Sequence, residues 1–207
     1  MSQKYQLLRL TKQQLPQAIA MIARAFHHDP FSVYVYPDEA KRRRSLPLMF
    51  SIALRYTLRY GEITTTPDIT GAACWLPPEN TTVDIHRLLR IGALTTSLQL
   101  GLPELLRLND AEAYMKSTHK RCSAGPHWYL WVLGVDPRLH GQGIGGTLIR
   151  TGLERADASG LPCYLETMNT NNVPLYQKFG FAIASEGDIP GSSLRMWGMV
   201  RPARNHL

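Results

Sequence analysis

A glycine-rich turn that leads into a helix is the feature of this sequence best suited to chemistry. It reads His-Gly-Gln-Gly-Ile-Gly-Gly over residues 140–146, and residues 147–158 follow it with apolar side chains on one helical face. The first turn of a helix leaves backbone N–H groups without intrahelical partners, and the positive end of the helix dipole lies there. Because glycines let phosphate oxygens approach these donors closely, the pattern is typical of a phosphate-binding turn.

Two other nucleotide-binding motifs compete for this turn. A Walker-type phosphate loop is excluded because no Gly-Lys-Ser/Thr follows the glycines. The dinucleotide fingerprint fits the glycine spacing at 141, 143 and 146, and Glu166 follows the last of these by twenty residues. However, residues 136–140 separate the glycines from the preceding strand. The 41 residues after Glu166 are also too few to complete a doubly wound sheet.

A carboxylate downstream of the turn is a candidate general base. Glu166 ends an expected strand, residues 163–166, and shares one face of it with Tyr164 and Met168. Burial among such neighbours raises the pKa of a carboxyl group towards that of a useful base. Glu166 could equally hold a charged amine, lie exposed at a sheet edge, or be an ion-paired structural carboxylate. The residues alone leave these interpretations open.

Tyr176 is a candidate proton donor on a short helix. Asn172 is the expected N-cap of this helix, and Pro174 lies in its first turn. Leu175 and Phe179 are then expected to face the core, at i and i+4, while Tyr176 points off that face. A phenol there could donate a proton in catalysis, or it could be a half-buried packing residue with its hydroxyl at the surface.

Hydrophobic periodicity predicts the elements that must position these residues. Residues 128–135 form a near-continuous apolar run, which is typical of a strand buried on both faces. Gly134 near its end indicates a bulge, a close approach of another backbone or a ligand, or the strand terminus. The preceding pattern predicts a strand at 5–11, a helix with an apolar face over 15–26, a helix at 39–60, a hairpin of strands at 62–66 and 71–76, and helices over 82–122.

The composition bounds the class of protein. The chain has 207 residues, 44% of them hydrophobic, which is enough to bury a core without disulfides or metals. The three cysteines are far apart and fit neither a disulfide framework nor paired metal ligands, so we expect a reducing compartment. The N-terminus is polar and no apolar run reaches the length of a membrane span, which predicts a cytoplasmic protein without a secretion signal.

A run of basic residues, 41–44, dominates the charge distribution. The formal net charge is +7, and residues 1–50 carry eight Lys and Arg against three Asp and Glu. Without interleaved aromatic residues or a nucleic-acid-binding motif, the run is more typical of a solvated helix face than of a nucleic-acid contact. His27 and His28 have no further metal ligand at a suitable spacing, so no metal site is predicted.

Four stretches in the second half of the chain resemble one known family. They are VDP at 135–137, HGQGIGG at 140–146, LET at 165–167 and NVPLYQKFGF at 172–181. Together they resemble the acetyl-CoA-binding core of the GNAT superfamily of N-acetyltransferases. Within this superfamily, their sequences are similar to those of its puromycin N-acetyltransferase-like members. The resemblance implies an α/β (α+β) fold. Its mixed, mostly antiparallel central sheet would have splayed strands, be flanked by helices and carry a helical insertion before the fourth strand.

The resemblance also implies an acetyl-CoA site and two catalytic residues. The pantetheine arm would lie between the strands at 128–135 and 162–168, paired with the backbone of Leu133 and Val135 beside a bulge at Gly134. Acetyl-CoA would further contact His140, Gly141, Gln142, Gly143, Ile144, Gly145, Gly146, Thr147 and Asn172. Tyr176 would protonate the leaving thiolate, and Glu166 would act as the base or hold the amine. The family commonly has Gln or Arg where this chain has His140. Because backbone N–H groups do most of the phosphate binding, this difference affects one side-chain contact and not the presence of the site.

The acceptor pocket is expected from other parts of the chain. The resemblance places around it the loop 186–193 and five residues that could equally belong to the core, Phe26, His27, Phe31, Tyr34 and Trp75. We predict one domain, with an N-terminal part at 1–78, the helical insertion at 79–126, the acetyl-CoA-binding core at 127–200 and a tail at 201–207. It would transfer acetyl from acetyl-CoA to the amine of a small molecule. A non-catalytic acyl-CoA-binding or sensor module and a basic nucleic-acid-associated protein are the alternatives, and a homo-oligomer is left open.

Overall fold

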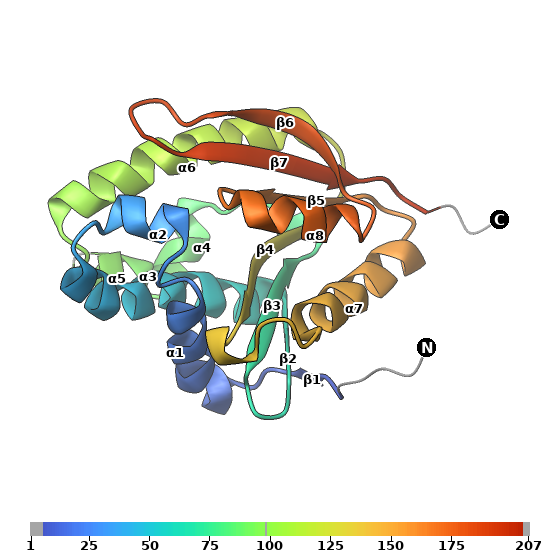
Figure 1. The fold of residues 1–207 in the computed structure, drawn as a ribbon, viewed down its shortest axis with the longest axis horizontal. Coiled ribbons are helices and arrows are strands. Elements are labelled where there is room, and N and C mark those ends of the chain that lie inside the picture. The colour runs from blue at the N-terminus through green and yellow to red at the C-terminus, as the bar shows by residue number, and fades with distance from the viewer. Residues whose placement is uncertain (1–5, 98, 205–207) are drawn as a thin grey trace.

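The computed structural model describes residues 6–97 and 99–204, which form one mixed sheet with helices on both faces (Figure 1). The sheet has seven strands in the order β1-β2-β3-β4-β5-β7-β6. Neighbouring strands are antiparallel except β4 and β5, which are parallel. The predicted fold class, a mixed and mostly antiparallel sheet flanked by helices, is confirmed.

The bounds of the elements match most of the sequence-based ranges. The strands are β1 (Leu8–Arg9), β2 (Glu62–Thr65), β3 (Gly71–Leu76), β4 (Trp128–Val135), β5 (Cys163–Thr167), β6 (Ala182–Asp188) and β7 (Arg195–Arg201). The helices are α1 (Leu15–Ala25), α2 (Pro30–Val35), α3 (Glu39–Tyr60), α4 (Ile85–Arg90), α5 (Ala93–Ser97), α6 (Leu102–Cys122), α7 (Ile144–Ala158) and α8 (Val173–Gln177). Short 3-10 turns precede or follow them at η1 (Lys12–Gln14), η2 (Pro78–Asn80), η3 (Pro137–Leu139) and η4 (Thr170–Asn172). Helices α4 to α6 are the predicted helical insertion before the fourth strand.

The parallel strands β4 and β5 separate soon after they begin. They are paired only at Trp128 with Cys163 and at Tyr129 with Tyr164. Beyond Tyr129, β4 remains paired with β3, whereas β5 continues along β7. The predicted splay is therefore present, and it leaves one edge of β4 unpaired from Leu130 onward among the described residues.

The irregularity in β4 lies at Trp131 and not at Gly134. Leu130 is opposite Trp75 and Val132 is opposite the preceding residue, Cys74, so Trp131 is the extra residue of a bulge. Gly134 is in regular register with Ala72, so the expected bulge there is wrong. Gly134 instead permits a close approach of α1, because a Cβ at this position would lie 2.6 Å from Cδ1 of Ile22.

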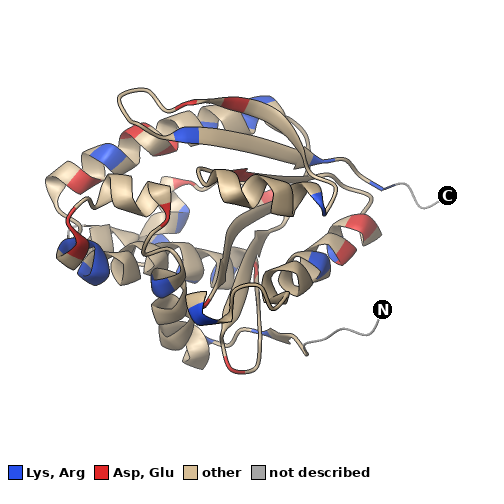
Figure 2. Cartoon of the chain, viewed as in Figure 1, with Lys and Arg blue, Asp and Glu red and all other residues tan. Residues whose placement is uncertain are grey.

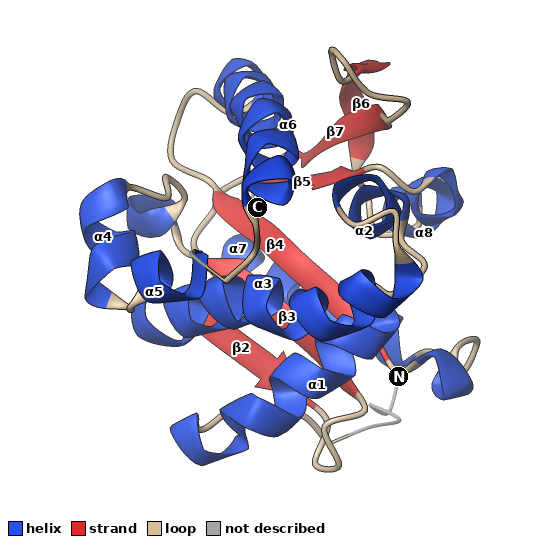
Figure 3. Ribbon diagram, turned by 90° about the vertical axis from the view of Figure 1, so that its left-hand side faces the viewer, coloured by secondary structure: helices blue, strands red, loops and turns tan. Residues whose placement is uncertain are grey.

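The two faces of the sheet carry different helices. Figure 3 shows α1 and α3 crossing the face of β2–β4, with α6 alongside β7 on the same side. Helices α7 and α8 cover the opposite face, where the buried cluster includes Trp75, Leu148 and Tyr176. Trp75 packs directly on Gly152 of α7, and a Cβ at Gly152 would overlap the indole ring. This contact sets how closely α7 lies on the sheet.

The hairpin of β6 and β7 was not expected from the sequence, which predicted a loop at 186–193. Most side chains of β6, the edge strand, are exposed, so the apolar alternation that would reveal it is missing. Cross-strand ion pairs of Arg195 with Glu186, at 2.8 Å, and with Asp188, at 3.2 Å, accompany the pairing. Arg201, which was expected in the tail, is the last residue of β7. Residue 5 of the expected first strand and residues 205–207 of the expected tail lie outside the described residues.

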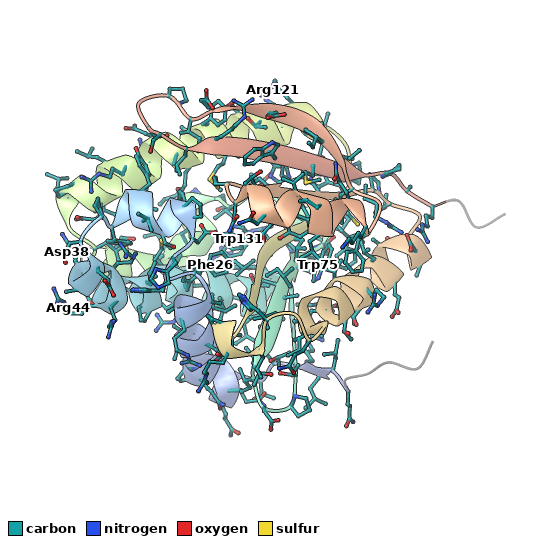
Figure 4. All side chains as sticks on the ribbon, in the orientation of Figure 1. Phe26, Asp38, Arg44, Trp75, Arg121 and Trp131 are labelled. Carbon is teal, nitrogen blue, oxygen red and sulfur yellow. The ribbon has the colours of Figure 1, made fainter. Side chains whose placement is uncertain are left out.

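The basic run at the start of α3 is only partly a solvated face. Figure 2 shows this group of cations at the N-terminal end of α3, where Arg44 is exposed (Figure 4). Arg42, in contrast, is buried, and its guanidinium donates to the carbonyl oxygens of Tyr36, at 2.7 Å, and Pro37, at 3.1 Å. Lys41 forms an ion pair with Glu104 of α6 at 2.8 Å. Two of the four cations therefore hold the fold together.

Three further features of the described residues bear on the class of protein. No described helix is long and apolar enough to cross a membrane. Within residues 6–97 and 99–204, no group of three or more His, Cys, Asp or Glu side chains is arranged to hold a metal ion. Cys74, Cys122 and Cys163 are free thiols.

The contact between Trp75 and Gly152 gives a test of the packing. We expect Gly152→Ala to lower the free energy of unfolding, measured by urea denaturation, by about 1–3 kcal/mol, which is typical of an overpacked core. The gain of up to about 1 kcal/mol from alanine in a helix is smaller than this cost. Gly125→Ala is the control, because a Cβ there meets nothing within 4 Å. A Gly152 variant as stable as the wild type would show that the indole can move aside.

Candidate active site

The unpaired edge of β4 presents backbone groups to the gap that the splay opens. The N–H of Trp128 donates to Pro162 on the β5 side, at 2.9 Å, and the N–H of Asp136 donates to Thr70 on the β3 side, at 2.8 Å. Backbone groups alternate in direction along a strand, and the extra residue at Trp131 shifts that alternation by one. Leu133 and Val135 therefore present their N–H and C=O groups to the gap, the two positions that the resemblance indicated.

His140 contacts the far end of this edge. Its Nε2 lies 3.1 Å from the carbonyl oxygen of Val135, and because a carbonyl can only accept, Nε2 carries the proton. The imidazole thus links the glycine-rich turn to β4. A carbonyl oxygen has two lone pairs, so this bond leaves Val135 able to accept a second donor.

The glycine-rich turn opens α7 in the predicted way. Gly141 and Gly143 have φ angles of +78° and +86°, a backbone conformation that side chains with a Cβ rarely adopt. A Cβ at either position would meet nothing within 4 Å, so the turn is open on that side. Gly143 is the N-cap of α7, and its carbonyl accepts the first helical hydrogen bond, from Thr147, at 3.1 Å.

Two residues of the turn have packing roles that the sequence did not show. The Thr147 side chain is buried, and its hydroxyl donates to the carbonyl of Gly143 at 3.2 Å, so it stabilises the start of α7. A Cβ at Gly146 would lie 3.0 Å from the ring of Phe179, so this glycine lets α7 approach the segment after α8. The amides of the first turn belong to Ile144, Gly145 and Gly146.

Asp136 fixes the path from β4 into the turn, a role that sequence analysis did not assign to this residue of the VDP stretch. The carboxylate is buried and accepts bonds from the Arg138 guanidinium, at 2.9 Å to each oxygen, and from Arg24 of α1, at 3.1 Å. The bonds from Arg138 are the main reason that the pKa of Asp136 lies well below its usual range. The available signal was the Asp-Pro pair directly after a buried strand, which is typical of a capped turn.

Glu166 lies on β5 beside the splay, on the same face as Tyr164. Its Oε1 accepts a hydrogen bond from the hydroxyl of Tyr129 on β4, whereas its Oε2 is buried and has no hydrogen-bond partner among the described residues. Burial raises the pKa of Glu166 to about 7, against smaller lowering effects from Tyr129 and Tyr164. The expected upward shift is confirmed. A carboxylate with this pKa can take up and release a proton near neutral pH.

A pair of histidines supports the aromatic residues around Glu166. His119 of α6 stacks on Tyr164 with ring centroids 4.1 Å apart, and its Nε2 lies 2.7 Å from Nε2 of His127. His127 Nδ1 donates to the carbonyl of Gly125 at 2.7 Å, so its Nε2 is the acceptor for His119. Burial, and then His127, lowers the pKa of His119 to about 4, which keeps this bond neutral.

Tyr176 is more buried than the sequence indicated. It lies in the core cluster on the α7 side and meets Phe181 edge-on at 6.1 Å, whereas Leu175 and Phe179 are only half-buried. The expectation that Tyr176 points off the core face is therefore wrong. Burial raises its pKa, and the carboxylates of Asp29 and Glu166 add to this, so the phenol keeps its proton at neutral pH.

Asn172 does not cap α8. The helix continues directly from the turn η4, so Asn172 already has helical dihedral angles and its side chain makes no capping bond. Its Nδ2 lies 3.5 Å from the hydroxyl of Thr167 instead. The capping side chain is Asn169, whose Oδ1 accepts from the amide of Asn171 at 3.1 Å at the start of η4. Asn172 is half-exposed near the end of β5, and the expected contact with acetyl-CoA stays a prediction.

The residues expected around the acceptor divide into two groups. Phe31 and Tyr34 of α2 pack against Met168, near a groove of about 510 Å³ lined by Pro30, Val33, Tyr34, Pro37, Arg107, Ser193 and Leu194. Phe26 packs on Phe50, at 4.8 Å between ring centroids, and Trp75 is fully buried on the α7 side (Figure 4). These two belong to the core, so Trp75 does not line a pocket.

The segment before α2 brings a further carboxylate towards the site. His27 is directed at Glu39, with 3.5 Å between Nε2 and Oε1, rather than at the gap. Asp29 caps α2 by accepting from the amide of Phe31 at 3.0 Å, and burial raises its pKa to about 6. The available signal for Asp29 was the Asp-Pro pair, because Asp is a favoured N-cap and Pro is favoured in the first helical turn.

Comparisons with known proteins agree with this geometry. Residues 105–181 match the model of the acetyltransferase (GNAT) family, a segment that contains β4, the glycine-rich turn, Glu166 and Tyr176. The chain is 28% identical over 183 residues to an uncharacterized N-acetyltransferase of Schizosaccharomyces pombe, covering 84% of this chain and 72% of that protein.

Solved structures of low sequence identity share the fold. A Corynebacterium glutamicum protein described as histone acetyltransferase HPA2 and related acetyltransferase superposes with a TM-score of 0.65 at 20% identity, covering 96% of each chain. The polyamine N-acetyltransferase of Drosophila melanogaster gives a TM-score of 0.62 at 15% identity, covering 94% of this chain and 98% of that one. The splayed strands and the glycine-rich turn thus lie in a segment that matches the GNAT acetyltransferase family, within a fold that solved acetyltransferase structures share.

Proposed function

We propose that this protein transfers an acetyl group from acetyl-CoA to the amine of a small molecule. The observation that carries the proposal is the alignment of three features along one gap. The free edge of β4 at Leu133 and Val135, the open glycine-rich turn at its end, and the buried carboxylate of Glu166 all border the splay of β4 and β5.

The chain's own groups suit the binding of acetyl-CoA. The amide and carbonyl groups of Leu133 and Val135 can pair with the amide groups of a pantetheine arm, as a neighbouring strand would. The amides at the start of α7, with the positive end of the helix dipole, can bind the pyrophosphate. The turn is open there because Gly141 and Gly143 have no Cβ and no neighbour within 4 Å of where one would lie.

Two side chains fit the proton transfers that acetyl transfer requires. A protonated amine must lose a proton before it can attack the thioester carbonyl, and Glu166 can accept it, directly or through water. The departing thiolate must gain a proton, and the buried phenol of Tyr176 can supply it. Glu166 could instead hold the cationic amine without taking its proton. The likeness to puromycin N-acetyltransferase-like proteins lies in the motifs of the acetyl-CoA-binding core, so we propose no particular acceptor from it.

Binding at the glycine-rich turn can be tested without turnover. We expect acetyl-CoA to raise the melting temperature of the wild type, NAD to leave it unchanged, and Gly143→Asp to abolish the acetyl-CoA effect, because a carboxylate would stand where phosphate must bind. Gly160→Asp is the matched control, because Gly160 also has positive φ, +62°, and open space around it, but lies at the other end of α7. Equal stabilisation of the Gly143 variant by acetyl-CoA would refute the assignment.

The role of Glu166 predicts a characteristic pH dependence. Because its pKa is raised to about 7, kcat/KM should fall as the pH drops through that value and the base becomes protonated. Glu166→Gln should reduce turnover in an acetyl-CoA-dependent thiol-release assay with a panel of amines, by about 10²–10⁴-fold, with a smaller loss at higher pH, where more amine is neutral. The affinity for acetyl-CoA should stay near that of the wild type. Unchanged turnover at neutral pH would return Glu166 to a structural role.

The role of Tyr176 can be separated from its packing. Tyr176→Phe keeps the ring against Phe181 and removes only the proton donor. We expect the acetyl-transfer step, measured before the steady state because product release could mask it, to slow by about 10²–10⁴-fold. The acetyl-CoA dissociation constant and the melting temperature should change little. A transfer step within about threefold of the wild type, far below the range for general acid catalysis, would make Tyr176 a packing residue only.

A further inference from the structure

The carboxylate of Glu166 is held at one oxygen and free at the other. Oε1 accepts from the hydroxyl of Tyr129, while Oε2 is buried without a hydrogen-bond partner among the described residues. A buried polar atom without a partner is unusual in a folded protein and calls for a functional explanation. Fixing one oxygen also fixes the direction of the lone pairs on the other. The geometry therefore makes Oε2 the atom available to an incoming proton.

Tyr129 occupies the position where β4 and β5 part. It is the last residue of β4 paired with β5, opposite Tyr164, and Glu166 lies two residues further along β5 on the same face. The Tyr129 side chain thus reaches from β4 across the opening to Glu166. Its ring is enclosed by His119, Tyr164 and Trp131, at centroid distances of 4.6, 5.7 and 6.4 Å. These contacts hold the ring in the position from which its hydroxyl donates to Glu166.

The surroundings provide no second completed bond to this carboxylate. The titratable and charged groups around the pair are Tyr164 from β5, Tyr176 from α8, and Glu112, His119, Arg121 and Cys122 from α6. The buried Tyr164 hydroxyl makes no hydrogen bond of full geometry, but it interacts with the carboxylate and lowers the pKa of Glu166, less than Tyr129 does. Among the described residues, Tyr129 is therefore the main hydrogen-bond donor to Glu166.

We propose that Tyr129 is a positioning residue that orients Glu166, tunes its basicity and directs Oε2 towards the acceptor amine. The proposal rests on the proposed role of Glu166 as the base. Burial raises the pKa of Tyr129 well above its usual value, so its phenol remains a donor across the working pH range. A donor to the ionised carboxylate stabilises its charged form, so the hydrogen bond from Tyr129 offsets part of the rise in the pKa of Glu166 that burial causes.

The pH profile of Tyr129→Phe distinguishes tuning from mere packing. Without the donor, the midpoint of the acidic limb of kcat/KM should move upward by about one pH unit or more, as expected for the loss of a hydrogen bond to a charged group. A residue that only packs would lower the rate by the same factor at every pH and leave the midpoint in place. That second outcome would overturn the proposal.

Two comparisons sharpen this experiment. Tyr56→Phe is the matched control, because Tyr56 is equally buried in the same aromatic cluster but donates to the carbonyl of Thr82, at 3.2 Å. It should leave the midpoint unchanged. If Tyr129 acts through Glu166, adding Tyr129→Phe to Glu166→Gln should cause little further loss of rate, whereas independent effects would multiply. Multiplying effects would contradict the proposal.

A direct titration separates this inference from the proposed function. In protein labelled with ¹³C at the glutamate carboxyls, the signal lost in Glu166→Gln reports the protonation of Glu166 without any substrate. We expect this midpoint to rise in Tyr129→Phe. It should fall when 3-fluorotyrosine, a stronger hydrogen-bond donor, replaces tyrosine at position 129, and this second substitution also tests the proposal if the Phe variant does not fold. An unmoved midpoint overturns the proposal whatever the activity. If the midpoint moves but Glu166→Gln keeps full turnover, Tyr129 still tunes the pKa of Glu166, but Glu166 is not the catalytic base. The catalytic part of the proposal would then be wrong.

Discussion

The short pairing of β4 with β5 is the constraint on which the rest of the site depends. Two strands that leave each other after Tyr129 expose backbone groups that a sheet would normally satisfy. From Tyr129 to Val135, β4 is paired with β3 apart from the bulge at Trp131, and Gly134 lets Ile22 of α1 approach the strand closely. Strand β5 instead continues along β7. The gap lies where β4 follows β3 and β5 follows β7.

Two buried carboxylates near the gap have opposite electrostatic settings. Asp136 is surrounded by the guanidinium groups of Arg138 and Arg24, which keep it ionised and make it a fixed anchor for the turn. Glu166 accepts its hydrogen bond from a phenol rather than from a guanidinium, so burial dominates and its pKa rises to about 7. The same residue type in two environments thus serves structure in one place and is suited to proton transfer in the other.

Sequence reasoning succeeded where the information is local. The glycine-rich turn, the helix after it and the buried strand before it are each encoded within a few consecutive residues. It failed where partners are distant. The bulge at Trp131 depends on the register with β3, and the bond from Tyr129 to Glu166 joins residues 37 positions apart. The resemblance placed Trp75 at the acceptor, whereas its ring is buried on the α7 face of the sheet, and periodicity does not show which face an aromatic residue covers. Asn172 was expected to be a cap, but a preceding turn removed the need for one.

The helical insertion acquires a fixed position over Glu166 because both ends of α6 are tied down. At its N-terminal end, Glu104 pairs with Lys41 of α3, and Arg107 donates to the carbonyl of Val35 in α2 at 3.1 Å. At its C-terminal end, His119 is bonded to His127 beside β4. Part of the basic run that resembled a solvated or nucleic-acid-binding face is thus an attachment point for the insertion. Because α6 carries Glu112 and His119 to the Tyr129 and Tyr164 side of the sheet, this attachment also defines the electrostatic surroundings in which Glu166 titrates.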